Sequence, residues 1–144
     1  MVTLPSRVIK NFFYAQSPRL GVMKTGWEGF MIYISNAFSL SMLDNEDAHE
    51  GVYLHVQEVG IPIVRTWLAR YDWTSCVGHA DTARLISNIL GVEIPTNRVS
   101  VTLSHNDFVF VAQYAGPRLP EGSTTLPEGA ELRFLMVGFF EIGL

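Results

Sequence analysis

The sequence is poor in cysteine, with Cys76 alone among its 144 residues. A single cysteine excludes an internal disulfide and any cysteine-rich zinc site, so nothing in the chain requires an oxidising compartment. A long apolar run is also missing. The longest one, residues 134–140, is too short to cross a bilayer, and the N-terminus lacks the compact apolar segment of a secretory signal. We therefore expect a cytoplasmic protein with no membrane partner.

Basic charge is scarce as well. The chain has 10 Lys and Arg against 14 Asp and Glu, a net charge of −4, and every basic residue after Phe30 is an arginine. Proteins that bind long nucleic acids present a broad basic face, so this composition excludes that class. A small anionic ligand is still allowed, because one or two arginines can hold a phosphate through local bidentate contacts.

Apolar residues, by contrast, are plentiful. They make up 48% of the chain and include nine Phe, five Tyr and three Trp, enough to fill the core of one domain of this length. Residues 1–30 hold too many aromatics for a solvated tail, and we interpret them as an N-terminal extension with a short helix around 7–14. Residues 31–144 are the predicted domain.

Hydrophobic periodicity predicts the elements of that domain. A helix is expected from just after Gly78 to the stop at Gly91, and another from Pro62 to about Arg70. Strands are expected at 31–35, 52–59, 72–77 and about 138–142, with 98–103 and 108–114 pairing as a hairpin, a short helical turn at 38–42 and a helix after Pro127. These elements indicate a single α+β domain, α/β-like, in which a mixed β-sheet is flanked by a few helices.

The start of the 78–91 helix is the strongest candidate site. It combines the imidazole of His79, the hydroxyl of Thr82 and the unpaired N–H groups of a helix N-terminus, which together can receive a phosphate. Because Gly78 has no side chain, a ligand can approach the backbone closely at this residue. The alternative is that His79 is a surface or capping residue.

Further polar residues gather around the predicted sheet edge. Asn36 and Ser39 follow the first strand, although both could simply cap the next helical turn. Arg98 and Gln113 are expected near each other at the two ends of the hairpin. Arg118 and Glu121 share a constrained loop that could equally be an exposed ion pair. The acidic segment 44–50 invites a metal site, but a solvated turn has the same composition, so we predict no metal.

Several of these pieces together resemble one family. They are Tyr33–Ser39, Val77–Ala83, Asn97–Val99, Gln113, Arg118–Gly122 and Phe139–Ile142, in order along the chain. This set is similar to the small viral anti-CRISPR ring nucleases and their cellular relatives, which degrade the cyclic tetra-adenylate second messenger of type III CRISPR defence. The loop between Gln113 and Arg118 is one residue longer than in that pattern, and residues 1–30 have no counterpart.

The resemblance implies specific roles. His79 would be the catalytic residue and Glu121 would orient it or its phosphate, while the ring would be bound by Asn36, Ser39, Asp81, Thr82, Arg98, Gln113 and Arg118. It also implies a homodimer closing over one ring, no metal or other cofactor, and action in the host-cell cytoplasm if the chain is virus-encoded. Two alternatives stay open at this point: a sponge that binds the ring without cutting it, and a structural module in which His79 only caps a helix.

Overall fold

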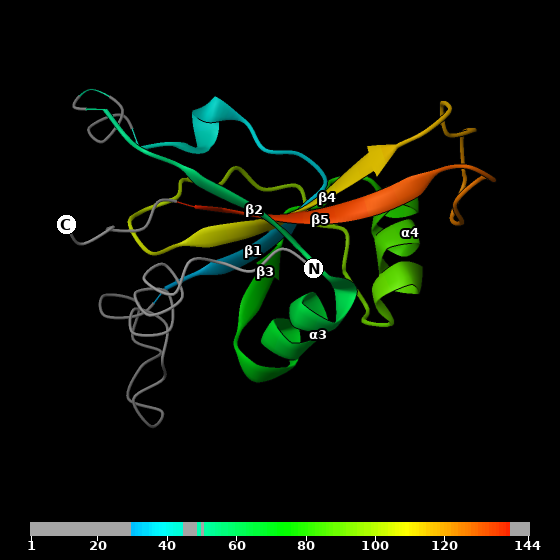
Figure 1. The fold of residues 1–144 in the computed structure, drawn as a ribbon, viewed down its shortest axis with the longest axis horizontal. Coiled ribbons are helices and arrows are strands. Elements are labelled where there is room, and N and C mark those ends of the chain that lie inside the picture. Colours follow the sequence, from blue (N-terminus) through cyan, green and yellow to red (C-terminus); the bar gives the residue numbers. More distant parts are fainter. Residues whose placement is uncertain (1–29, 45–48, 50, 139–144) are drawn as a thin grey trace.

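The computed structural model describes residues 30–44, 49 and 51–138, and these form one mixed sheet with helices on one side (Figure 1). The strands are β1 (Ile32–Ser35), β2 (His55–Val59), β3 (Trp73–Ser75), β4 (Phe108–Ala115) and β5 (Glu131–Gly138). Their order in the sheet is β2-β5-β4-β1-β3. β1 runs parallel to both β3 and β4, whereas β5 is antiparallel to β4 and β2. The predicted α+β domain with a mixed sheet is confirmed.

Two helices cover one face of this sheet, as Figure 1 shows: α3 (Ile61–Arg70) and α4 (Ala80–Leu90). Both were predicted, and their local signals are visible in the structure. Pro62 lies in the first turn of α3, and Gly91 ends α4 in the left-handed conformation at φ 69° that glycine adopts without strain. The buried sides of the helices pack on Ile32, Ile34, Phe108, Phe110 and Phe134 to form the main core.

Strands β1 and β4 are apolar along most of their length because both of their faces are covered. Val109, Val111 and Val137 point away from the helices into a second, smaller cluster. That cluster is closed by the 3-10 helix η1 (Leu40–Met42) and by residues 101–103, which lie on the face opposite α3 and α4 (Figure 1). The predicted turn at 38–42 is therefore this short helix.

Two predicted elements are wrong. Residues 98–103 form no strand, and only Leu103 makes a bridge, a parallel one to Leu43. The hairpin with 108–114 does not exist, because β1 and β5 already occupy both edges of β4. The predicted helix after Pro127 is instead β5, whose alternating side chains enter the two cores in turn. The final strand thus begins earlier than expected, and residues 139–142 lie outside the described part of the chain.

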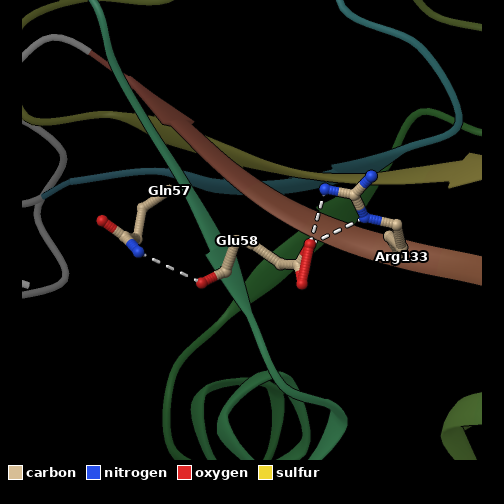
Figure 2. Close-up of polar contacts among 3 residues, drawn as sticks. All are labelled: Gln57, Glu58 and Arg133. Atoms are coloured by element: carbon tan, nitrogen blue, oxygen red, sulfur yellow. Dashed lines mark hydrogen bonds and ion pairs between the residues drawn. The ribbon is translucent and has the colours of Figure 1, made fainter. Parts of the chain in front are cut away.

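Strand β2 buries the side that carries His55. Val56 is 55% exposed, whereas His55 is half-buried. The strand is an edge strand held by β5 alone. Across that pairing, Arg133 donates from Nε to Oε1 of Glu58 at 2.7 Å, and Nη2 of Arg133 lies 2.6 Å from the same oxygen (Figure 2). Such an exposed pair contributes little stability but fits the observed register.

Three further expectations concern residues that the structure does not describe in full. The short helix at 7–14 and the rest of the 1–29 segment lie outside the described residues, as do 45–48 and 50 of the acidic segment. Among the helices that the structure describes, none combines the length and apolarity that a bilayer span needs.

Candidate functional site

The three parallel strands end at one edge of the sheet, and the chain leaves them in different directions. After β1 it turns toward η1, on the face away from the helices, whereas after β3 it enters α4 on the helix face (Figure 1). Neighbouring strands whose connections leave on opposite faces open a crevice at their carboxyl ends, where open sheets usually bind ligands. Asn36 follows β1 and His79 follows β3 in the chain, so both come after the carboxyl ends of neighbouring parallel strands.

His79 occupies the position just before the first turn of α4. Its backbone is extended, at φ −121° and ψ 132°, and its carbonyl accepts the first helical hydrogen bond from Ala83 at 2.9 Å. The imidazole itself makes no capping hydrogen bond, and the residue is exposed. The side chain is therefore available to a ligand at a helix N-terminus that also carries the partial positive charge of its free N–H groups.

A cavity of about 800 Å³ lies between the start of α4 and the loop that joins β4 to β5. Its lining includes five of the residues singled out from the sequence: His79, Asp81, Thr82, Arg118 and Glu121. The loop and the helix are about 40 residues apart in the chain, so the fold brings together groups that the sequence only placed separately. The cavity is lined by one imidazole, one guanidinium, two hydroxyls and two carboxyl groups, a set suited to a phosphate ester with nearby ribose hydroxyls.

Arg98 does not line this cavity but contacts Gly78, the residue before His79. Its Nε donates to the carbonyl of Gly78 at 3.1 Å. A Cβ on Gly78 would lie 3.0 Å from Cγ of Arg98, so the expected close approach to this glycine is made by the arginine itself. The guanidinium is exposed and sits beside the residue that precedes His79.

The segment carrying Arg98 is fixed to the end of β3 by several hydrogen bonds. The side-chain amide of Asn97 donates to the Ser75 carbonyl at 2.8 Å, and its backbone N–H donates to the Val77 carbonyl at 2.8 Å. The buried Ser75 hydroxyl donates to the Pro95 carbonyl at 2.5 Å. Ser75 and Asn97, which we call the brace, therefore hold in place the stretch that leads to Gly78 and His79. No role was predicted for either residue from the sequence.

Four of the expected ligand-binding residues lie outside the cavity, and Arg98, which contacts Gly78, is the first of them. Ser39 accepts a hydrogen bond from the Ser41 backbone as the N-cap of η1, so the capping interpretation is correct for its side chain. Asn36 is exposed directly after β1. Gln113 is exposed on β4 and pairs with Arg133 of β5, not with the segment of Arg98. These residues share the carboxyl edge of the sheet with His79 but not its pocket.

Four further residues line the cavity. Leu119, Pro120 and Gly122 belong to the Arg118–Gly122 segment that carries the resemblance but had no predicted role of their own, and Ser123 was not singled out from the sequence. Prolines at 117 and 120 restrict the backbone, Gly122 has φ 81°, and the Ser123 N–H donates to the Pro120 carbonyl at 3.1 Å. The loop is therefore shaped by its own turn, and the Pro and Gly spacing was the available signal.

Groups with shifted pKa values lie elsewhere. Burial raises the pKa of Asp107, although backbone N–H groups of Ser104 and Met31 oppose this by donating to its carboxylate at 2.9 and 2.8 Å. The pKa of Tyr33 is raised mainly by burial, and further by the nearby charges of Asp107 and Cys76. Burial also raises the pKa of the Cys76 thiol. Burial lowers the pKa of His55. Asp107 stands just before β4, at the end of this strand opposite the cavity loop, and its carboxylate ties Met31 and Ser104 together there.

Within the part of the chain that the structure describes, no three His, Cys, Asp or Glu side chains gather in a way suited to a metal ion.

Residues 32–136 match the family model described as STIV B116-like. This match spans well over half of the chain, so the protein belongs to the STIV B116-like family. Over 77 residues it is 32% identical to uncharacterized protein 26 of Sulfolobus islandicus filamentous virus (isolate Iceland/Hveragerdi), covering 54% of this chain. The alignment spans 62% of that relative, less than two thirds of its length.

A solved structure, B116 of Sulfolobus turreted icosahedral virus, shares the fold. The two superpose with a TM-score of 0.61 at 21% sequence identity, over 75% of this chain and 98% of B116. At this identity the likeness concerns the fold alone. Both relatives are proteins of Sulfolobus viruses, which supports a viral origin for this one.

Proposed function

We propose that the protein is a ring nuclease that cleaves cyclic tetra-adenylate to short linear oligoadenylates, without a metal, and so switches off type III CRISPR defence. One observation carries the proposal: a single cavity gathers His79, Thr82, Arg118 and Glu121, groups that the resemblance to viral anti-CRISPR ring nucleases assigns to catalysis and ring binding. The viral origin of the relatives agrees with an anti-CRISPR role in the host-cell cytoplasm.

The proposed chemistry uses the nucleophile that RNA carries. The ribose 2′-hydroxyl gives its proton to water and attacks the adjacent phosphorus, the bond from phosphorus to the 5′-oxygen breaks, and the product ends in a 2′,3′-cyclic phosphate and a 5′-hydroxyl. His79 supplies the proton to the departing 5′-oxygen, because an imidazole changes protonation state near neutral pH. Arg118 offsets the charge that grows on the phosphorus oxygens, and Glu121 orients His79 or its phosphate. The protein then has to hold the attacking and leaving oxygens in line.

A homodimer is the assembly that we propose around the ring. A cyclic tetranucleotide has a two-fold axis, so two protomers related by a two-fold can present the same residues to opposite phosphates. The cavity supports this arrangement because it is exposed on the protomer, and a second copy would add the area needed to bury the ring.

The test is incubation of the wild type, His79→Ala and Glu121→Ala with cyclic tetra-adenylate in a chelator, read by chromatography. We expect more than one equivalent of linear product per dimer for the wild type and a loss of about a hundredfold or more for His79→Ala, the scale of general acid catalysis. His105→Ala is the matched control, because His105 is also exposed but lies in the turn before β4, at the opposite sheet edge.

Each result has a definite meaning. Cleavage that survives in His79→Ala at the rate of the His105→Ala control contradicts the proposed acid. Binding of the ring by the wild type without turnover would instead establish the sponge. If neither variant nor wild type binds the ring, the cavity serves another ligand and the proposed function is wrong.

A further inference from the structure

The loop from residues 117 to 124 carries both Arg118 and Glu121, so its placement decides whether these side chains face His79. Its inner part has a shape of its own, set by the turn from Pro120 to Ser123. What remains to be fixed is how that preformed turn sits relative to α4, the helix that begins beside His79.

One end of the loop is attached to the sheet. The hydroxyl of Tyr114 donates to the carbonyl of Pro117 in a short hydrogen bond. Tyr114 belongs to β4, the central strand of the sheet, whose residues 108–112 are all buried, so this end of the loop is attached to the sheet. Gly116 has φ 152° and sits where a Cβ would lie only 2.7 Å from Ala130, so the chain turns tightly here.

The other end is attached to the helix. The side-chain amide of Asn88 donates to the Thr124 carbonyl at 2.9 Å. Asn88 lies seven residues after Asp81 on α4, hence on the same helical face, and Asp81 lines the cavity. The loop therefore runs along the exposed face of α4, from the Asn88 attachment back toward the helix start.

We propose that Tyr114 and Asn88 are positioning residues of the proposed nuclease, an inference that rests on the proposed function. They attach the two ends of the 117–124 loop to β4 and to α4, and so hold Arg118 and Glu121 over His79. Neither side chain lines the cavity, so both act through the loop and not on the ring.

The experiment uses Tyr114→Phe, which removes only the hydroxyl, and Asn88→Ala, with Asn88→Gln as the conservative variant that keeps an amide donor. Thr66→Ala is the matched control, because the Thr66 hydroxyl also makes an exposed hydrogen bond to a backbone carbonyl, that of Pro62 at 2.9 Å, but on α3. Hydrogen–deuterium exchange of the loop amides is measured without ligand, and kcat is measured with cyclic tetra-adenylate.

We expect faster exchange at 118–123 and a fall in kcat of about tenfold or more in Tyr114→Phe and Asn88→Ala, since a misplacement of about 1 Å can cost a hundredfold. Asn88→Gln recovers part of kcat, and Thr66→Ala matches the wild type. In a Glu121→Ala background Asn88→Ala costs clearly less, because its effect passes largely through the loop, whereas a merely structural defect would add in full.

The proposal is overturned if the loop amides of both variants exchange at the wild-type rate, or if their kcat equals that of Thr66→Ala. It is also overturned if the Asn88→Ala loss is undiminished when Glu121 is absent. A wild type that leaves the ring intact refutes the proposed reaction instead, and this outcome is distinguishable because the exchange measurement needs no substrate.

Discussion

Replacing Gly78 by alanine displaces Arg98 without removing any polar group from the site. The added Cβ would lie 3.0 Å from Cγ of Arg98, 3.7 Å from its Nε and 3.9 Å from its Cδ. Carbon atoms rest at roughly 3.5–4.0 Å, so the arginine stem has to move by about 0.5–1 Å. Gly78 has no positive φ, so alanine causes no backbone strain there.

That movement separates Nε of Arg98 from the Gly78 carbonyl, which it now meets at 3.1 Å. A shift of about 1 Å at a positioned group can cost up to a hundredfold in rate, so we expect kcat/KM for cyclic tetra-adenylate to fall about tenfold to a hundredfold. The assay is chromatography of the product over a range of ring concentrations, together with the thermal unfolding midpoint of each variant.

Gly60→Ala is the control, because its Cβ would lie at an ordinary 3.6 Å from Pro62 and the residue stands at the start of α3. We expect a loss of activity in Gly78→Ala but not in Gly60→Ala, with both variants still folded. A folded Gly78→Ala variant with wild-type kcat/KM would refute it, since the contact between Arg98 and Gly78 would then have no bearing on the reaction.

Three further predictions concern stability. Asn97→Ala removes the hydrogen bond that the side-chain amide donates to the Ser75 carbonyl and should lower the free energy of unfolding by about 1–2 kcal/mol in urea titration, whereas an unchanged value would mean that the brace is not needed. Phe110→Ala, at a fully buried core position, should lower it by about 3–5 kcal/mol, and a loss near zero would contradict the packing described. Burial lowers the pKa of His55 in the folded state, so the unfolded chain binds more protons and stability should fall as pH drops through about 6.5 toward the folded pKa. His55→Gln should flatten this dependence, and an equally steep curve in the variant would rule out His55 as its source.

The helices could be predicted because their signals are local. The spacing of Leu85, Ile86 and Leu90 and the left-handed Gly91 determine α4 within one stretch of chain, and Pro62 does the same for the start of α3. Strands β1 and β4 were predictable as buried apolar runs. Each of these segments could be predicted without knowing which residues, distant in the chain, it contacts.

Which strands pair depends on residues that are distant in the chain, and there the predictions from the sequence were wrong. Residues 98–103 alternate like a strand, but β4 has only two edges and these are taken by β1 and β5. Residues 131–138 contain helix-forming residues after a typical helix start, yet their eight-residue pairing with β4 makes them β5. Tertiary hydrogen bonding outweighs local propensity in both places.

By itself, then, the sequence determined which residue types are present, that one domain can fold from them, and that a helix begins at His79. Only the tertiary structure decided that Arg118 and Glu121 meet His79 in one cavity. It also decided that four other predicted binding residues lie outside that cavity: Asn36, Ser39, Arg98 and Gln113. The physical reason is distance along the chain. Contacts between groups about 40 residues apart are set by the strand order of the sheet and by the attachment of the 117–124 loop. Neither of these can be predicted from a local sequence pattern.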